Sequence, residues 1–453
     1  MLELVQSANG VLWGPVLLIL LCGTGIYYTF RLKFIQVRKF GEACKLLFGH
    51  MKFKGGERKE GEMTPFQALS TAIAAQVGTG NLTGAATALV MGGPGAIFWM
   101  WVSAFFGMAT IYGEATLAQT YKTTTEDGEV TGGPVYYIRA AFKGTFGKVL
   151  ATLFAVFIIL ALGFMGNMVQ SNSIGAAFES VFAARGIDFN PIIVGVILAV
   201  FAAFIFIGGT NRLAAFVEKV VPFMAVLYIV GSLFVILMNI TAVPGVLKTI
   251  VTYAFSPYAM GGGALGITVQ QAVRYGVARG LFSNEAGMGS TPHAHARAAA
   301  KNPHEQGLTA MLSVFIDTFI VLNMTVFAIL STGVLGNGET GIALTQSAFV
   351  SVMGGFGDIF VAICLLFFAG STIFSWHFFA AVNVKYLFGE AAVKVFSSIV
   401  LIFIVVGSTL KVDLVWELAD FFNGLMVFPN LLALLALSGV VVASSKKFDK
   451  KKQ

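Results

Sequence analysis

The sequence has 453 residues, of which 57% are hydrophobic and only 11% are charged, whereas soluble domains carry about 25% charged residues. A soluble protein of this size needs more polar residues to cover its exterior, so the composition predicts that lipid surrounds most of the chain. The net charge of +7 does not indicate nucleic acid, because the basic residues lie mostly in loops beside apolar runs. Cys22, Cys44 and Cys364 are scattered, which indicates neither a disulfide framework nor a metal site.

The apolar runs predict an all-α membrane protein, because a helix needs about 20 apolar residues to cross the hydrocarbon core. The first run is too long for the core of a signal peptide and is expected to remain as a helix. Eleven spans are predicted, at about 11–30, 66–92, 95–121, 148–183, 191–209, 213–239, 264–291, 306–335, 357–388, 392–409 and 416–443. Residues 245–260 predict a short helix at the membrane surface, and segment 123–147 is expected to cover one face.

The basic residues predict the orientation of the chain. With eleven spans, the basic loop after the first span and the lysine-rich tail fall on the same side, while the opposite side keeps only Arg185, Lys248 and Lys411. Because basic loops stay in the cytoplasm, we expect a plasma-membrane protein with its N-terminus outside and its C-terminus inside. The basic residues expected on the cytoplasmic side include Lys52, Lys54, Arg58 and Lys59 of the loop, Lys451 and Lys452 of the tail, and Lys385 and Lys394 between spans.

The eleven spans divide into one plus ten, and the ten into two halves of five. We expect an extra helix with a basic loop at 1–62, a first repeat at 63–240, an extracellular connection at 241–263, a second repeat at 264–443 and a basic tail at 444–453. The two spans that open the halves run in opposite directions, which is typical of an inverted-topology repeat.

Both of these opening spans contain glycines where a helix is expected to break. The first contains VGTGN, from Val77 to Asn81, and the second contains YGVARG, from Tyr275 to Gly280. Paired interruptions of this kind indicate the binding site of a transporter. The alternative is that the glycines only allow close packing between helices.

The first break has the chemistry to bind an amino acid. Unwinding at Gly78 and Gly80 frees backbone groups, which is tolerated inside a membrane only where they face a polar cavity. The outer half-helix then offers N–H groups to a carboxylate, while the carbonyls that end the inner half near Gln76 suit a cation or an ammonium group. A zwitterionic amino acid matches both ends.

The span at 357–388 contains two adjacent hydroxyl residues in an apolar setting. Ser371 and Thr372 lie within LLFFAGSTIFSW, and the carbonyl of Ala369, three residues before Thr372, lies on the same helix face. Sodium prefers such hard oxygen ligands. The alternative is that these hydroxyls bond back to their own helix.

The GTGN core, the block GLFSNEAGMGS from Gly280 to Ser290 and the one-plus-ten plan resemble the alanine or glycine:cation symporters over most of the chain. The resemblance implies a LeuT-type fold of five plus five helices, with discontinuous first and sixth core helices. It also implies sodium-coupled uptake of alanine or glycine by alternating access, with sodium as the co-transported ion and no organic cofactor.

The resemblance also implies a set of site residues. The carbonyls of Ala74, Val77 and Ala369 and the hydroxyl of Thr372 would bind sodium. LeuT-type transporters usually add a hydroxyl just after this threonine, but here that position is Ile373, so Ser371 is the substitute. The implied substrate site comprises Gln76, Gly78, Thr79, Gly80, Asn81, Phe164, Gln170, Gly276, Gly280 and Trp376. For Gln170 the alternative is a hydrogen bond between helices.

Several ionisable residues fall inside apolar runs, where each costs about 2.5–3.5 kcal/mol at a helix centre. We favour a structural role, in which ion pairs tie the seventh span to its neighbours, for Arg279, Glu285 and Asp317. The functional alternative is a gate or a second cation site at Asp317. Glu114 and Arg274 are also intramembrane. For His293, His295 and His304, a solvated cytoplasmic loop is favoured over a metal site.

The sequence therefore predicts a secondary transporter for small neutral amino acids that is not an enzyme. The alternatives are proton coupling, a channel and a membrane-embedded enzyme. A channel usually forms its pore as an oligomer, whereas an internal repeat lets a monomer suffice. An enzyme would need a catalytic pair such as His with Asp within the spans, and the sequence shows none.

Overall fold

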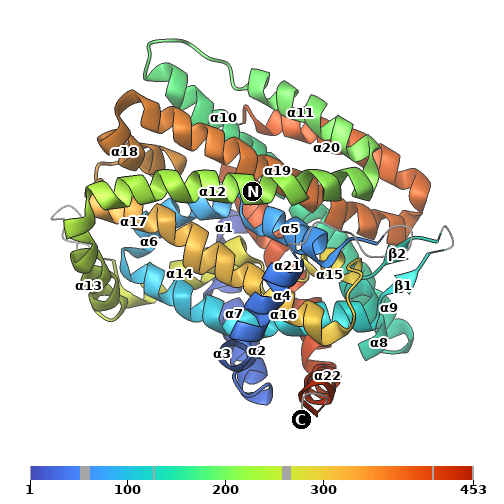
Figure 1. Ribbon diagram of the computed structural model, residues 1–453. Helices are drawn as coiled ribbons and strands as arrows, with labels where there is room; N and C mark the ends of the chain where they lie inside the picture. The colour runs from blue at the N-terminus through green and yellow to red at the C-terminus, as the bar shows by residue number, and fades with distance from the viewer. Residues whose placement is uncertain (1, 51–61, 126–127, 258–266, 411–412, 451–453) are drawn as a thin grey trace.

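The structure is a computed structural model that describes residues 2–50, 62–125, 128–257, 267–410 and 413–450. The described chain is almost entirely helical (Figure 1). Its sheet is one antiparallel pair, β1 (Thr123–Thr124) with β2 (Val130–Thr131), within the segment predicted to cover one face. Some predictions lie outside the described residues: Lys52, Lys54, Arg58 and Lys59 of the basic loop, Lys411, the tail lysines Lys451 and Lys452, and the part of the central connection at 258–266.

The first half of the chain contains thirteen α-helices, three π-helical segments and one 3₁₀ turn among the described residues. In order these are α1 (Leu2–Val11), η1 (Leu12–Val16), α2 (Leu17–Arg31), α3 (Ile35–Arg38), α4 (Phe40–His50), α5 (Pro65–Gln76), η2 (Gly80–Gly84), α6 (Ala85–Gly92), α7 (Gly95–Thr120), α8 (Pro134–Ala141), α9 (Gly144–Ile158), η3 (Ile159–Gly166), α10 (Asn167–Ala183), α11 (Ile192–Ile207), α12 (Gly209–Met238), η4 (Ile240–Ala242) and α13 (Val243–Ala254).

The second half continues the all-helical pattern. Its elements are α14 (Val269–Asn284), α15 (Pro292–Ala296), α16 (Pro303–Val314), η5 (Phe315–Leu322), α17 (Asn323–Thr332), α18 (Gly341–Met353), η6 (Gly354–Phe356), α19 (Gly357–Phe388), α20 (Glu390–Gly407), α21 (Asp413–Ala436) and α22 (Ser438–Lys450). The short helix expected at 245–260 corresponds to α13, whereas α18 was not expected from the sequence.

Eight helical stretches of the described chain are long and apolar enough to cross a membrane: Leu2–Arg31, Gly95–Thr120, Gly144–Ala183, Gly209–Met238, Pro303–Thr332, Gly341–Phe388, Glu390–Gly407 and Leu414–Ala436. Three of the predicted spans are not among them. The span at 66–92 is divided between α5, η2 and α6, while α11 and α14 each have 16 residues. The chain is therefore a multi-pass membrane protein by length and composition.

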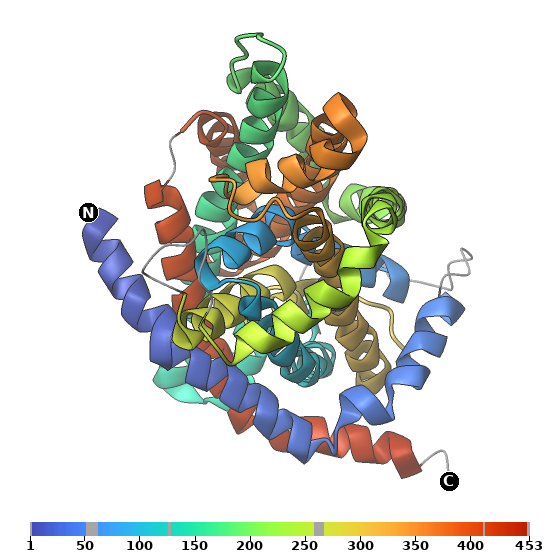
Figure 2. The same cartoon turned by 90° about the vertical axis from the view of Figure 1, so that its left-hand side faces the viewer.

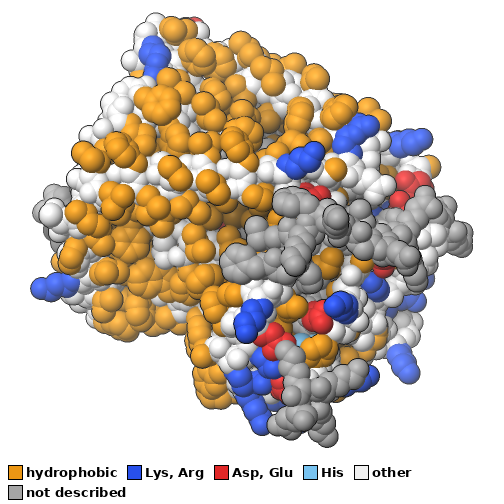
Figure 3. All heavy atoms as spheres, in the orientation of Figure 1, with side chains coloured by type: hydrophobic (Ala, Val, Ile, Leu, Met, Phe, Trp, Pro, Cys, Tyr) orange, Lys and Arg blue, Asp and Glu red, His pale blue; other side chains and the backbone are white. Residues whose placement is uncertain are grey.

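The surface in Figure 3 divides by polarity. A broad hydrophobic area covers the left and upper parts, and charged side chains gather at the lower right and along the right-hand edge. Large apolar side chains such as Ile207, Val200 and Val230 are strongly exposed. In an aqueous protein such a contiguous area would be an aggregation hazard, but in lipid it is the expected exterior.

The helices that surround the breaks are buried at the centre. The helix α7 packs against α14 and α16, and α19 packs against α5 and α10. Figure 2 shows α1 and α2 running along the outside of the molecule, where α1 contacts α21 and α2 contacts α7. The first helix thus lies at the periphery, outside the central bundle that contains α5 and α19.

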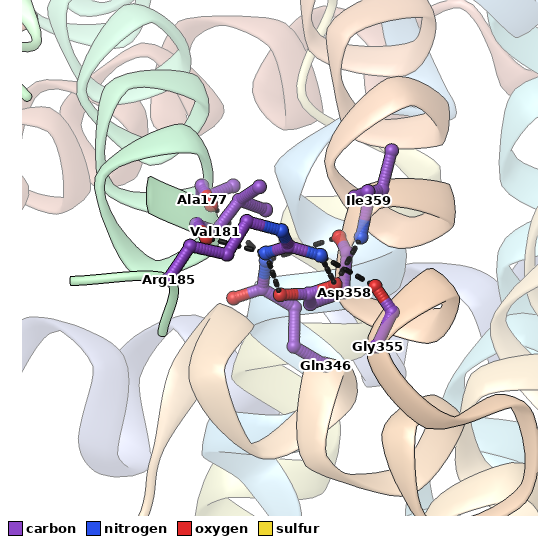
Figure 4. Close-up of polar contacts among 7 residues, drawn as sticks. All are labelled: Ala177, Val181, Arg185, Gln346, Gly355, Asp358 and Ile359. Carbon is purple, nitrogen blue, oxygen red and sulfur yellow. Dashed lines mark hydrogen bonds and ion pairs between the residues drawn. The ribbon is translucent and has the colours of Figure 1, made fainter. Parts of the chain in front are cut away.

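An ion pair and a neighbouring side-chain amide join α10 to α19 and α18 (Figure 4). The guanidinium of Arg185, just after α10, donates to both carboxylate oxygens of Asp358 at 2.8 and 3.1 Å, and it also donates to the carbonyl of Gly355. The amide of Gln346 on α18 donates to the carbonyls of Ala177 and Asp358. These bonds connect the ends of three helices on one side of the bundle.

Candidate functional site

The first interruption lies where the sequence places it. The helix α5 starts with a capping box in which Thr64 and Gln67 exchange hydrogen bonds, and it ends at Gln76. Val77 has a non-helical ψ of 86°, and helical geometry resumes at Thr79 and continues as η2 from Gly80. Backbone groups are therefore released inside the protein, between two helical halves.

Two side-chain amides satisfy the N–H groups that this turn releases. The Asn81 side-chain oxygen accepts from the N–H of Gly78 at 3.1 Å, and the Gln170 side-chain oxygen on α10 accepts from the N–H of Thr79 at 3.1 Å. All four residues are buried. Gln170 thus makes the hydrogen bond between helices that was the alternative to a substrate contact, and it occupies one N–H that was expected to bind a carboxylate.

On the other side of the turn, oxygen atoms converge on Thr372 of α19. Its hydroxyl lies 2.8 Å from the carbonyl oxygen of Ala74, 3.0 Å from that of Phe368 and 3.4 Å from that of Val77. One hydroxyl proton cannot satisfy three carbonyls fully. The cluster therefore has more acceptor oxygens than donors, and this is the composition that hard cations prefer.

The close approach of α19 to the turn depends on Gly78. A Cβ at this position would lie 2.5 Å from the Thr372 hydroxyl oxygen and 3.1 Å from the Gln170 side-chain oxygen. No side chain fits there without moving one of these groups. Glycine at position 78 thus brings the turn, Thr372 and Gln170 together.

A buried carboxylate lies on the opposite side of the turn. Asp317 in η5 accepts hydrogen bonds from Asn81 at 2.7 Å, from Ser283 at 3.0 and 3.1 Å, and from Thr318 at 2.9 Å. Asn81 therefore bridges Gly78 in the first break and Asp317. Among the described residues, no lysine or arginine pairs with Asp317.

The second interruption lies at 285–291, after α14, and not at 275–280 as predicted. The YGVARG segment is wrongly assigned as a break, because α14 is continuous from Val269 to Asn284. Gly287 and Gly289 have φ of +86° and +82°, a backbone conformation that glycine adopts without strain. Their N–H groups donate to Glu114 on α7 at 3.0 and 2.9 Å. The irregular segment thus begins within the SNEAGMGS block, at Glu285.

The chain matches the model of a family, described as the sodium:alanine symporter family, over residues 1–453. The sodium/alanine symporter AgcS of Methanococcus maripaludis is 42% identical over 452 residues, which cover 99% of this chain and 97% of that protein. The chain belongs to the sodium:alanine symporter family. A Bacillus subtilis protein named as a probable sodium/glutamine symporter, GlnT, is 43% identical and covers 100% of this chain and 91% of that protein.

The fold also matches a solved transporter. The crystal structure of MhsT in complex with L-phenylalanine superposes with a TM-score of 0.60 at 15% identity, over 85% of this chain and 90% of that one. This likeness shows the LeuT-type fold alone. Membership of a symporter family makes the protein a membrane transporter and excludes the enzyme alternative.

Within this family member, most of the predicted site residues lie together, and four do not. The hydroxyl of Ser371 bonds to the carbonyl of Phe368 and contacts the sulfur of Met224 on α12, so it does not join Thr372 at the turn. The ring of Phe164 packs against Phe396 and Phe403 on α20. Gly276 and Gly280 pack against α7, at Ala96 and Met100 respectively, so they serve the close packing that was their alternative.

The residues that remain at the turn leave some polar atoms unused. The side-chain oxygen of Gln76 and the hydroxyl of Thr79 are buried and have no hydrogen-bond partner among the described residues. The Gln76 amide nitrogen donates to the carbonyl of Asn284 at 2.7 Å. Gly80 lies against Ser283, whose Cα would be 3.0 Å from a Cβ at position 80. Ala369 is fully buried one turn before Thr372.

Trp376 joins α19 to the second interruption. Its indole N–H donates to Glu285 at 2.5 Å, and Glu285 also accepts from Ser290 at 2.6 Å. The ring lies against Gly166, where a Cβ would come within 2.6 Å of a ring carbon. The sequence identified Trp376 as a wall, but it did not identify its bond to Glu285.

Three polar residues of this region were not singled out from the sequence. Ser283 and Thr318 bind Asp317, and Asn284 donates to Thr318 at 3.2 Å. Two of them belong to the SNEAGMGS block, which was recognised only as a family motif. Thr318 directly follows Asp317 in the sequence. It could have been identified because a polar residue beside an intramembrane carboxylate is a candidate partner for it.

The expected ion pairing of the seventh span with its neighbours is confirmed for Arg279 but not for Glu285 and Asp317. Arg279 pairs with Asp420 on α21 at 3.1 Å, whereas Glu285 and Asp317 are bound by neutral donors. Glu114 is bound in the same way, by the two glycine N–H groups and by Asn430 at 2.7 Å. Neutral donors let these carboxylates remain in the bundle without a partner of opposite charge.

The histidines are buried, which contradicts the expected solvated loop. His293 bonds to the carbonyl of Ser290 and to Asn383, His295 to Gln306, and His304 to Tyr112. Burial lowers the pKa of His293 to about 4 and that of His295 to about 3, so both are neutral at physiological pH. No cluster of metal-binding side chains occurs in the described chain.

Proposed function

We propose that this protein couples the entry of sodium to the uptake of alanine or glycine by alternating access. The contact between Thr372 and the carbonyls of Ala74 and Val77, across 295 or more positions of the chain, carries the proposal. It places a hydroxyl and several carbonyls at the end of an interrupted helix inside a membrane protein. Family membership supports sodium as the coupling ion.

In this proposal sodium binds between α5 and α19. The carbonyls of Ala74, Val77 and Ala369 and the hydroxyl of Thr372 are its ligands. On binding, the Thr372 proton turns away from Ala74, because the hydroxyl oxygen must face the cation. Ser371 is not a ligand in this proposal, since its hydroxyl points to Met224.

The amino acid binds beside this ion at the turn. The unpartnered side-chain oxygen of Gln76 accepts from the ammonium group, and the unpartnered hydroxyl of Thr79 donates to the carboxylate. The carboxylate displaces the Gln170 amide from the N–H of Thr79, so that Gln170 moves when substrate enters. Gly78, Gly80, Asn81 and Trp376 shape the site.

A small substrate is favoured because the turn is tightly enclosed. Even one added methyl group at Gly78 would meet Thr372 and Gln170. Glutamine is the competing substrate, since one relative is named as a sodium/glutamine symporter. Its longer side chain would need space that the close approach at the turn does not offer, which favours alanine and glycine.

Asp317 gives the proposal a second cation position. Its carboxylate is fully buried, and Asn81 links it directly to the turn. A buried carboxylate without a positive partner is a functional candidate in a membrane protein. Sodium would replace the donated bonds with cation contacts, whereas a proton would neutralise the carboxylate. Because Asp317 could bind a proton in place of sodium, proton coupling is the alternative to sodium coupling.

The proposed topology has eleven spans and two inverted repeats, at 63–240 and 264–443, preceded by an extra helix. The interrupted spans are α5 with α6, and α14 with the segment at 285–291. The N-terminus lies outside and the C-terminus in the cytoplasm, on the positive-inside rule. A monomer contains every residue of the proposed site.

The test is radiolabelled alanine uptake into proteoliposomes that contain the full chain. Uptake driven by an inward sodium gradient, lost when potassium replaces sodium and competed by glycine, supports the proposal. Uptake driven equally by a pH gradient without sodium contradicts sodium coupling. Stronger competition by glutamine than by glycine contradicts the substrate. Asp317→Asn is run in parallel, and we expect it to lower the Hill coefficient for sodium if a second cation binds there.

A further inference from the structure

A cavity lies away from the interrupted helices. Its volume is about 710 Å³, and it lies among the end of α11, the start of α12, the last turns of α19 and the start of α20. This volume is within the range of about 300–1,000 Å³ that is usual for small-molecule sites. In Figure 1 these helix ends lie at the right-hand side of the bundle.

This cavity is on the other face of α19 from the proposed transport site. Thr372 faces the turn at Gly78, and Trp376 bonds to Glu285 in the second interruption, whereas Ala381 lines the cavity. At about 100° per residue, Ala381 is rotated by about 180° from Thr372. The cavity is therefore separated from the transport site by the body of the helix.

The walls of the cavity are apolar and aromatic. Phe206 from α11, Phe374 from α19 and Leu401 from α20 line it. The imidazole of His377 stacks on Phe206 with ring centroids 3.5 Å apart and bonds to Ser397 at 2.8 Å, so its polar atom is already satisfied. This part of the cavity suits a hydrocarbon chain.

The mouth of the cavity carries an excess of positive charge. Arg297, Lys385 and Lys394 line it, against Glu129 and Glu390. Lys385 lies 2.6 Å from Glu390 and 3.7 Å from Glu129. Lys394 is exposed, and its ammonium group has no acidic partner among the described residues.

Arg297 is the unusual member of this group because it is only 4% exposed. One terminal nitrogen donates to Thr210 at 3.0 Å and the other lies 3.5 Å from Glu129. Within the part of the chain that the structure describes, the buried Nε has no hydrogen-bond partner. An unpaired donor on a buried guanidinium is costly to leave unsatisfied. A planar guanidinium beside a hydroxyl is well suited to bind a phosphate.

The mouth also lies at the border of the lipid-facing surface. Ile207 and Phe204 on α11 and Val395 on α20 are strongly exposed beside it. In Figure 3 several Lys and Arg side chains gather at the upper right, where the hydrophobic area ends. Basic residues in this position mark the level of the lipid headgroups.

We propose that this cavity binds one anionic phospholipid, with an acyl chain between Phe206, Phe374 and Leu401 and the phosphate at Arg297 and Lys394. Basic pockets between membrane helices on the cytoplasmic side recognise anionic headgroups by this combination of charge and depth. The hydroxyl of Thr210 also lines the cavity and can donate to a phosphate oxygen, because it acts as the acceptor in its bond with Arg297. The site is independent of the proposed substrate and ion.

The test uses the full chain, purified and delipidated in neutral detergent. Binding of phosphatidylglycerol is measured by native mass spectrometry and by the shift in thermal midpoint, with phosphatidylcholine, oleate and inorganic phosphate as separate arms. The variants are Lys394→Gln at the mouth and Ala203→Trp, which fills the cavity. Lys148→Gln is the matched control, because Lys148 is another exposed lysine, at the start of α9 and outside the lining.

We expect one phosphatidylglycerol to bind more tightly than phosphatidylcholine. Loss of one basic residue should weaken this binding about fivefold in Lys394→Gln. Ala203→Trp should abolish it, and Lys148→Gln should leave it unchanged. Equal binding of phosphatidylcholine, an equal effect of oleate or phosphate alone, or full binding to Ala203→Trp would overturn the assignment. Alanine uptake by the variants shows that they are folded.

Discussion

The hydroxyl oxygen of Thr372 lies 2.8 Å from the carbonyl oxygen of Ala74, 298 positions earlier in the chain. The contact forms only because α5 ends at Gln76 and Gly78 has no side chain to obstruct α19. A helix end, a glycine and a hydroxyl thus combine into one oxygen-rich cluster. In a sodium symporter family member this cluster is the natural candidate for the coupling ion.

Thr372→Ala should raise the sodium concentration that half-saturates alanine uptake by about tenfold or more. It removes the hydroxyl oxygen from the proposed ligand set, and a polar contact to a charge contributes about 1.5–3 kcal/mol. Sodium-dependent uptake in proteoliposomes measures the change. Thr372→Ser keeps the hydroxyl and should remain close to the wild type.

Ser371→Ala is the matched control for this variant, since the Ser371 hydroxyl bonds to its own helix and to Met224. We expect its sodium dependence to be unchanged. If Ser371→Ala weakens sodium binding as much as Thr372→Ala does, then the Ser371 hydroxyl is also a ligand, and the ligand set inferred from the geometry is wrong.

Gly78→Ala should abolish sodium-dependent uptake while the protein still inserts and purifies as a monodisperse species. The new Cβ would lie 2.5 Å from the Thr372 hydroxyl oxygen, so α19 or the turn must move. Alanine uptake and sodium-dependent thermal stabilisation are the two measurements. Gly23→Ala on α2 is the control, because a Cβ there meets nothing within 4 Å. Normal sodium coupling in Gly78→Ala would show that the close approach is not required.

Local signals in the sequence were sufficient for the class of fold and for the first break. Long apolar runs require lipid, and glycines at 78 and 80 within such a run require a polar neighbour. The same reasoning failed at Gly276 and Gly280, which pack against α7. A single sequence cannot distinguish a glycine that allows close packing from one that breaks a helix. Only the position of α7 distinguishes them.

The side chains around the turn were harder to predict, because their partners come from distant segments. Gln170 could be placed in the site, but its bond to the N–H of Thr79 depends on how α10 packs. Ser371 and Thr372 are adjacent, and the direction in which each points follows from the rotation of α19. The sequence predicts ion pairs for Glu285 and Asp317, yet neutral donors from several segments bind them.

Acidification should destabilise the protein between about pH 6.5 and pH 4. Burial lowers the pKa of His293 to about 4, below the value of 6.5 for an exposed histidine. In this window the unfolded chain binds a proton that the folded chain excludes, so stability is full above pH 6.5 and falls as the pH falls. The free energy of unfolding should decrease by about 1.4 kcal/mol per pH unit for this residue.

His293→Gln tests this origin, because glutamine can bond to Asn383 but does not titrate. Thermal midpoints measured from pH 7.5 to pH 4.5 should show a shallower decline in the variant. His295, whose pKa burial lowers to about 3, contributes separately and remains in both proteins. An identical pH profile for the wild type and the variant would assign the acid sensitivity to other groups.

The ion pair between Arg185 and Asp358 should stabilise the bundle through its geometry. Both terminal nitrogens of the guanidinium donate, to both carboxylate oxygens and to the carbonyl of Gly355, so the pair joins α10 to the start of α19 (Figure 4). Arg185→Ala should lower the thermal midpoint by a few degrees. Bidentate ion pairs with a fixed geometry are the ones that contribute measurably to stability.

A double-mutant cycle separates the interaction energy between Arg185 and Asp358 from the effect of removing either charge alone. Asp358→Asn alone should also lower the midpoint, and the double variant should fall by less than the sum of the two, because the second change removes a bond that is already lost. Arg139→Ala, at an exposed arginine of α8, controls for the general effect of removing a basic residue. Strict additivity of Arg185→Ala and Asp358→Asn would mean that the two side chains do not interact in solution, and that the helix ends are joined by Gln346 instead.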